Sequence, residues 1–182
     1  MEKIAVFILG PDSPGIIATV SKTLFDHGCN LEDVSQTILQ GVFVGIFIGT
    51  MTEKRSEELI IAHLRAAIQP KGLTAHVSRL EHKIDHQLTY EPFVITAIGP
   101  DRPGLVAGIA EILALHAVNI TNLKAVFRGA KDPERNIMIY EIDIPTGIDQ
   151  HAFRTALYSR AEQLGLDISL QHREIFEQLN RV

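Results

Sequence analysis

The motif GPDSPG (Gly10–Gly15) recurs 89 residues later as GPDRPG (Gly99–Gly104). At this offset, nine of the 21 positions from residue 10 to residue 30 are identical, and apolar pairs such as Ile16 and Leu105 keep their character. Self-similarity at a fixed offset is the signature of a duplicated structural unit. The repeat therefore predicts that the chain of 182 residues contains two copies of a small module. Each copy is near the lower size limit for independent stability.

Each copy begins with a short apolar strand that ends at the Gly-Pro turn and is followed by an amphipathic helix. A strand hairpin, a second helix and a last strand complete the unit. In the first copy the expected strands are residues 4–9, 31–39, 42–50 and 73–80, with a turn at Gln40-Gly41 and helices after Gly15 and Ser56. In the second copy they are residues 93–98, 120–128, 136–144 and 166–172, with helices after Gly104 and from about Asp149.

The apolar positions in each predicted helix indicate which face is buried. The first helix of the first copy is expected to bury Ile16, Ile17, Val20 and Leu24. The second helix is expected to bury Leu59, Ile60, Leu64 and Ile68, and its counterpart in the second copy carries Phe153, Leu157 and Leu164.

The order βαββαβ, found twice, predicts an α+β protein of two ferredoxin-like domains. Each would have a four-stranded antiparallel sheet with two helices on one face. We expect a first domain over residues 1–81, a linker over 82–91, a second domain over 92–174 and a C-terminal tail over 175–182.

Composition limits the classes of partner. The formal net charge is −5 and no run of Lys and Arg forms a basic stripe, which argues against direct nucleic-acid binding. A single cysteine excludes an intrachain disulfide and favours a reducing compartment. The first apolar run, residues 4–9, is too short for a signal-peptide core or a membrane span. These features predict a cytoplasmic protein that binds no membrane.

The turn before each first helix has the chemistry of a small zwitterion site. Free backbone N–H groups and the positive end of the helix dipole attract an anion, and Gly15 and Gly104 let a ligand approach the main chain. Asp12 and Asp101 supply a carboxylate for a cation nearby. The site would suit the head group of an α-amino acid; the alternative is a stiff turn in which the aspartate caps the helix.

The glycine spacing of this turn does not make a nucleotide site. Gly10 and Gly15 have the spacing of a phosphate loop, but Ile16-Ile17 stands where Lys and then Ser or Thr are required. Asn30 and Asn119 open the strand after the first helix. They could bond a ligand or, alternatively, their own turn backbone.

The βαββαβ order, the D-x-P-G turn followed by Ile or Leu, and the element Gly28-Cys29-Asn30-Leu31 resemble those of ACT domains. The resemblance covers nearly the whole chain, and two ACT domains alone are similar to the repressor subfamily of the glycine cleavage system. It implies that an amino acid or other small metabolite binds between the loop of one domain and the second strand of another. The implied contacts are Asp12, Pro14, Gly15, Ile16 and Asn30 in the first copy and Asp101, Pro103, Gly104, Leu105 and Asn119 in the second.

The same resemblance implies regulation rather than catalysis. The subfamily is expected to act on transcription through a DNA-binding partner, so the implied partners are a small-molecule amino acid and another protein. The alternative is a non-catalytic regulatory subunit of an amino-acid metabolic enzyme. No acid pair, nucleophile–base group or metal cluster stands out in the sequence, so we expect no catalytic residue, no metal and no cofactor. Small modules with open sheet edges favour a homodimer, and the polar loop over residues 129–135 is either a solvated hairpin or a partner contact.

Histidines and the single cysteine have both a structural and a functional interpretation. His82 and His86 have the spacing of helical metal ligands, although a linker with two solvated histidines is the commoner case. His27 and His116 recur at the end of the first helix, where an imidazole complements the helix dipole. Cys29 has no basic neighbour in the sequence and is expected in the core.

Overall fold

The computed structural model describes residues 2–52, 57–80, 89–126 and 136–180 of the chain. The chain divides into two compact units, Met1–Ile84 and Asp85–Val182, which we call the first and second modules. The first module contains β1 (Glu2–Pro11), α1 (Ile16–Asp26), β2 (Cys29–Leu39), β3 (Val42–Met51), α2 (Glu57–Ile68), the short 3-10 helix η1 (Gln69–Lys71) and β4 (Thr74–Arg79). The second module contains β5 (Tyr90–Gly99), α3 (Leu105–Leu115), β6 (Asn119–Val126), β7 (Asn136–Pro145), α4 (Gln150–Gln163), β8 (Asp167–His172) and α5 (Arg173–Asn180).

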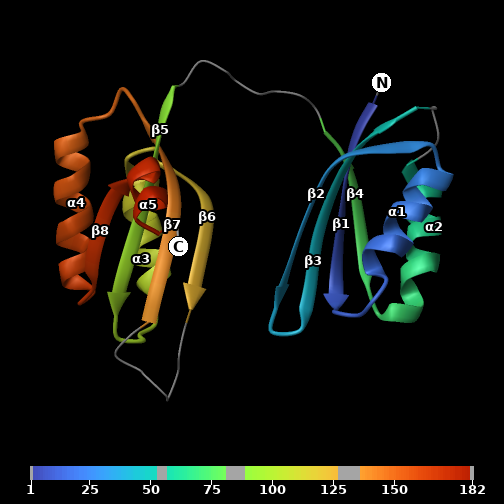
Figure 1. Cartoon of the computed structure of the whole chain (residues 1–182), viewed down its shortest axis with the longest axis horizontal. Helices are drawn as coiled ribbons and strands as arrows, with labels where there is room; N and C mark the ends of the chain where they lie inside the picture. The colour runs from blue at the N-terminus through green and yellow to red at the C-terminus, as the bar shows by residue number, and fades with distance from the viewer. Residues whose placement is uncertain (1, 53–56, 81–88, 127–135, 181–182) are drawn as a thin grey trace. The chain divides into compact units, whose positions relative to one another are not determined.

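Each module has one four-stranded antiparallel sheet. The strand order is β2-β3-β1-β4 in the first module and β6-β7-β5-β8 in the second. The central strands, β1 with β3 and β5 with β7, pair along their full length. Helices α1 and α2 cover one face of the first sheet, and α3 and α4 cover one face of the second (Figure 1). The predicted α+β fold, two ferredoxin-like βαββαβ units, is therefore confirmed.

The irregularities of the two sheets also repeat. The hairpin between β2 and β3 turns at Gln40 and Gly41, as predicted, with φ angles of 51° and 82°; two successive positive φ angles match the twist of the flanking strands. The register of β2 shifts between Leu31 and Asp33, and that of β6 shifts between Ile120 and Asn122. The duplication thus includes a bulge at the same place in each module.

Each module has a core of its own between its sheet and its two helices. Val20 and Phe47 are fully buried in the first core, and Ile109 and Phe153 in the second. Removal of this apolar surface from water is the main favourable term in folding. Burial in the second core also raises the pKa of Tyr140 to about 12, so this side chain stays neutral.

Two side chains that the sequence pattern placed in the core are exposed. Ile16 is buried on α1, whereas Ile17 is 36% exposed. On α2, Ile60 is buried and Leu59 is 43% exposed. Adjacent helical positions point about 100° apart, so two neighbouring apolar residues do not both face the sheet. The other positions predicted to be buried in these two helices lie in the core.

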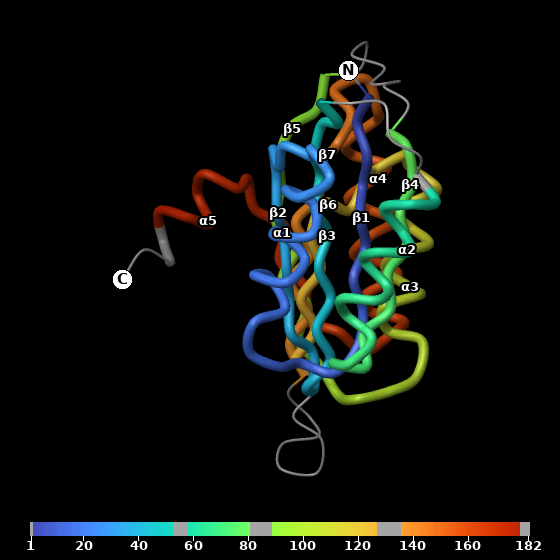
Figure 2. The backbone as a smooth tube through the Cα atoms, turned by 90° about the vertical axis from the view of Figure 1, so that its right-hand side faces the viewer, coloured from blue at the N-terminus to red at the C-terminus, as the bar shows by residue number. Residues whose placement is uncertain are grey.

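A helix occupies most of the segment that the sequence left as a C-terminal tail. Figure 2 shows α5 extending away from the rest of the second module. Its first residue, Arg173, lies 3.5 Å from a carboxylate oxygen of Glu141 and 3.9 Å from one of Asp143. At the other boundary, β5 begins at Tyr90, inside the expected linker. Among the described residues, no helix combines the length and the apolar character that a membrane span requires.

Two leucines of α3 provide a test of this packing. Leu113 is fully buried and Leu115 is 78% exposed. Leu113→Ala is expected to lower the free energy of unfolding by about 2–5 kcal/mol because it leaves a cavity, and Leu115→Ala should change it by less than about 0.5 kcal/mol. Urea denaturation measures both values. Equal effects of the two substitutions would contradict the assignment of the buried face of α3.

Candidate functional site

The first helix of each module begins at a glycine in a left-handed conformation. Gly15 is the N-cap of α1 with a φ of 86°, and Gly104 is the N-cap of α3 with a φ of 88°. Neither helix receives a hydrogen bond from a capping side chain. Glycine thus occupies the N-cap position in both modules, and neither Asp12 nor Asp101 is the N-cap residue.

The absence of a cap leaves backbone donors at the start of each helix. The first intrahelical bond of α1 joins Thr19 N to Gly15 O at 3.0 Å, and that of α3 joins Gly108 N to Gly104 O at 2.8 Å. The N–H groups of residues 16–18 and 105–107 precede these bonds and have no acceptor within the helix. They lie at the positive end of the helix dipole, where an anion is stabilised.

A pocket of about 490 Å³ lies beside this turn in the first module. We call it the first loop pocket; its lining residues are Asp12, Ser13, Gly15, Ile16, Ile17, Ala18, Gln36 and Phe43. The turn and α1 supply most of the lining, and β2 and β3 supply Gln36 and Phe43. The volume is in the range of small-molecule sites.

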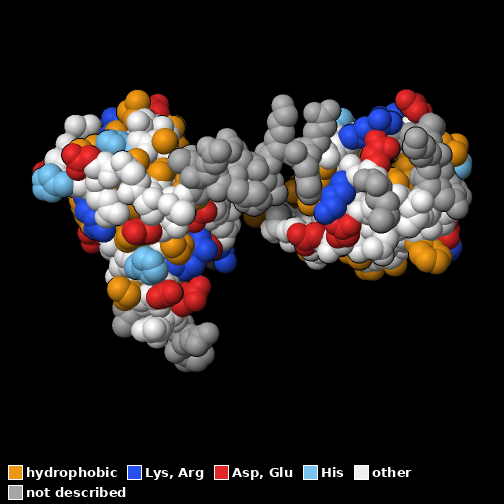
Figure 3. Space-filling model, turned by 90° about the horizontal axis from the view of Figure 1, so that it is seen from above, with side chains coloured by type: hydrophobic (Ala, Val, Ile, Leu, Met, Phe, Trp, Pro, Cys, Tyr) orange, Lys and Arg blue, Asp and Glu red, His pale blue; other side chains and the backbone are white. Residues whose placement is uncertain are grey.

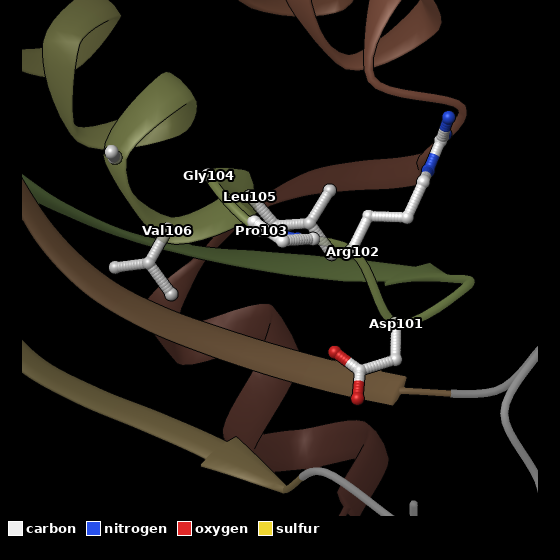
Figure 4. A pocket seen from close by; sticks show the side chains of 7 residues that line it. Asp101, Arg102, Pro103, Gly104, Leu105 and Val106 are labelled. Carbon is white, nitrogen blue, oxygen red and sulfur yellow. The ribbon is translucent and has the colours of Figure 1, made fainter.

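The second module has a pocket at the same turn, with a volume of about 530 Å³. This second loop pocket is lined by residues 101–107, from Asp101 through Ala107. Figure 4 shows that Asp101 and Arg102, although adjacent, point in different directions. Of the predicted contacts, the structure brings together at the two pockets Asp12, Gly15, Ile16, Asp101, Pro103, Gly104 and Leu105. Pro14 belongs to the same turn but does not line the first loop pocket.

The predicted asparagines lie at the opposite end of their own sheets. Asn30 on β2 pairs with Thr50 on β3, and Thr50 pairs with Lys3 near the start of β1. Asp12 follows the other end of β1. The two ends of such a strand are roughly 25 Å apart. In the second module Asn119 pairs with Asp143, again far from the loop pocket.

Asn30 lines a smaller pocket of about 170 Å³ instead. Both asparagines lie in paired strands and not in the turn itself. A contribution of either residue to the loop pocket of another ACT-like domain stays a prediction.

A charged side chain ties each loop to the connection before the last strand. Lys71 Nζ donates a hydrogen bond to the carbonyl oxygen of Pro14 at 2.9 Å. In the second module the direction is reversed, because Arg102 on the loop donates to the carbonyl oxygen of Leu164. The sequence analysis missed both contacts. The sequence did contain a signal for these contacts. The Gly-Leu pair at residues 72–73 recurs at residues 165–166, and this repeat aligns Lys71 with Leu164.

The two repeated histidines have structural roles. His27 is the C-cap residue of α1, and its ring stacks on that of His63 from α2, with ring centroids 4.6 Å apart and 2.6 Å between His27 Nε2 and His63 Nδ1. His116 occupies the same place after α3 and meets the ring of Phe153 edge-on at 5.4 Å. Each histidine thus joins the first helix of its module to the second.

Cys29 and the residue types that bind metal ions were the remaining candidate groups. Cys29 is buried, and burial, followed by the charge of Glu32, raises the pKa of its thiol. Within the described ranges, no cluster of three or more His, Cys, Asp or Glu residues could hold a metal ion. His82, His86 and the loop over residues 129–135 lie outside the described residues.

The fold and the two loop pockets define a tandem-repeat protein of small α+β modules, each with a pocket at its first strand-to-helix turn. A family model of the ACT domain matches residues 2–78 and 91–171. The chain belongs to the ACT domain family and contains two such domains in tandem.

Three proteins are similar to this chain in sequence or in fold. A UPF0237 protein from Methanopyrus kandleri is 36% identical over 90 residues, which are 49% of this chain and 96% of the relative. The crystal structure of an unknown protein from Galdieria sulphuraria has a TM-score of 0.76 at 24% identity and covers 94% of this chain and 98% of its own. That of a proposed glycine cleavage system transcriptional repressor has a TM-score of 0.70 at 19% identity and covers 93% and 96%. The predicted resemblance to tandem ACT proteins is thus confirmed at the level of the fold.

The strained turn can be tested at Gly104. An added Cβ would meet no atom within 4 Å there, so Gly104→Ala isolates the cost of the positive φ angle. We expect a loss of about 1–2 kcal/mol in the free energy of unfolding. Gly147, which also has open space around it and no positive φ, is the control, and Gly147→Ala should have no destabilising effect beyond about 0.5 kcal/mol. Equal stabilities of the two variants would show that the turn tolerates a side chain.

The raised pKa of Cys29 predicts an unreactive thiol. The thiolate is the nucleophile, and burial disfavours it in the folded chain. Reaction with a chromogenic disulfide at neutral pH should be slow for the folded protein and fast after unfolding in urea. A folded protein that reacts at the rate of the unfolded chain would show that Cys29 is accessible.

Proposed function

We propose that the chain is a regulatory protein that binds a free amino acid at its loop pockets and passes this state to a protein partner. The observation that carries the proposal is the uncapped helix start beside an aspartate, present in both loop pockets. The ligand carboxylate accepts hydrogen bonds from the N–H groups of residues 16–18 or 105–107, and the ligand ammonium lies beside Asp12 or Asp101.

A second surface completes each site in this proposal. Each loop pocket is built from a single module and is open to solvent, whereas ligand sites usually bury most of the ligand surface. In this proposal Asn30 and Asn119, at the far ends of their sheets, serve the pocket of another ACT domain. A homodimer is one way to supply that domain.

An apolar sheet surface supports the proposal of a protein partner. On the face of the first sheet that carries no helix, Phe7, Leu9 and Ile46 are each more than a third exposed. Contiguous exposed apolar side chains mark contact surfaces. Acidic and basic side chains are interspersed on the face seen in Figure 3, and the net charge is −5, so a partner rather than this chain would contact DNA. The fold shared with the proposed repressor supports transcriptional control of amino-acid metabolism as the output.

A calorimetric screen of the twenty amino acids at millimolar concentration tests the proposal. At least one amino acid should bind saturably, with two sites per chain. Asp12→Ala and Asp101→Ala should each weaken one site by roughly 10- to 100-fold, because each removes a charge-assisted contact. The double variant should lose both sites.

Asp26 provides the matched control. It lies at the other end of α1, where it is exposed and pairs with Lys22 at 2.7 Å, and Asp26→Ala should leave the affinity unchanged. Saturable binding that persists in the Asp12/Asp101 double variant would refute the site assignment. No response to any amino acid would refute the function itself.

A further inference from the structure

The first loop pocket contains an apolar wall in addition to its polar groups. Ile17 and Ala18 from α1 and Phe43 from β3 contribute to this wall. Gly45 leaves room for the Phe43 ring, because an added Cβ there would lie 2.8 Å from two of the ring atoms. The ring is buried in the core of the first module, so this part of the wall belongs to the packed sheet.

Ile17 is an exposed apolar residue at the edge of the first loop pocket. Outward positions of a helix are normally polar, and on α1 the large apolar exceptions are Ile17, which is 36% exposed, and Phe25 near the other end of the helix, which is 75% exposed. Val106 stands at the same position of the repeat and lines the second loop pocket. An apolar side chain thus faces the loop pocket at the same helical position in both modules.

From the apolar wall, which has counterparts in both loop pockets, we infer that the ligand of the loop pockets is an amino acid with an aliphatic side chain, of the size of valine or leucine. The inference rests on the proposed function and specifies its ligand. The head group occupies the polar turn, and the side chain covers Ile17 in the first module and Val106 in the second. Burial of these apolar surfaces against each other contributes to affinity in proportion to the area removed from water.

Other classes of amino acid use this pocket less well. Glycine has no side chain and would leave the apolar wall in contact with water. A charged side chain would lose hydration against Ile17 and Phe43, and such burial is unfavourable without a partner of opposite charge. The charged groups at the first loop pocket, Asp12 in its lining and Lys71 next to Gly15, lie at the turn, where the head group binds.

The test is a calorimetric series on the full chain with glycine, alanine, valine and leucine, together with aspartate and lysine. The dissociation constant should fall along the aliphatic series by about fourfold for each added methylene group. Aspartate and lysine should bind more weakly than valine. Because the head group is the same throughout, the series reports on the side-chain site alone.

A paired variant locates the side-chain site. Ile17→Thr combined with Val106→Thr should weaken leucine binding by about tenfold and alanine binding by less than about twofold. The retained alanine binding shows that the variant is folded. The matched control is Val34→Thr combined with Val126→Thr, two strand valines that are 43% and 42% exposed and do not line either loop pocket; it should not change either affinity.

The outcomes separate this inference from the function on which it rests. Binding of glycine or of a charged amino acid in preference to leucine would overturn the inference and leave the proposed function standing. Leucine binding that is unchanged in the Ile17/Val106 variant would also overturn it. Absence of binding by every amino acid would overturn both.

Discussion

The backbone of each module passes from strand to helix through one glycine with a φ angle near +87°, Gly15 or Gly104. At this angle a Cβ crowds the neighbouring carbonyl, so the turn is made by the main chain and not by a capping side chain. The first N–H groups of the helix therefore remain unbonded within it. The unbonded N–H groups beside each loop pocket depend on this single conformation.

The two modules hold this turn in place by different means. Lys71 reaches the first loop from the connection before β4, whereas Arg102 reaches from the second loop to the connection before β8. In both cases a cation bonds to a carbonyl oxygen, an interaction stronger than one between neutral groups. The charged residue lies before the last strand in the first module and on the loop itself in the second. The glycine at the turn has the same conformation in both. The loop pockets can therefore share one function although Ser13 in the first corresponds to Arg102 in the second.

The helix-free faces of the two sheets carry different side chains. In the first module this face presents Phe7, Leu9 and Ile46, and in the second it carries Glu141 and Asp143, which pair with Arg173. Apolar surface favours association with another protein, whereas a solvated ion pair contributes little to it. This difference supports the proposal that a protein partner contacts the first module.

The sequence by itself determined the duplication, the order of the elements, the Gln40-Gly41 turn and the location of the loop pockets. These features depend on local patterns, such as apolar periodicity and turn residues, that a single stretch of chain contains. Only the tertiary structure decided that Ile17 is exposed at a pocket, that Asn30 lies at the far end of the sheet from Asp12, and that Lys71 and Arg102 tie down the loops. The contact of Lys71 joins residues that are 57 positions apart in the sequence, and that of Arg102 joins residues that are 62 positions apart. A local sequence pattern does not show which of two distant segments supplies the charged side chain.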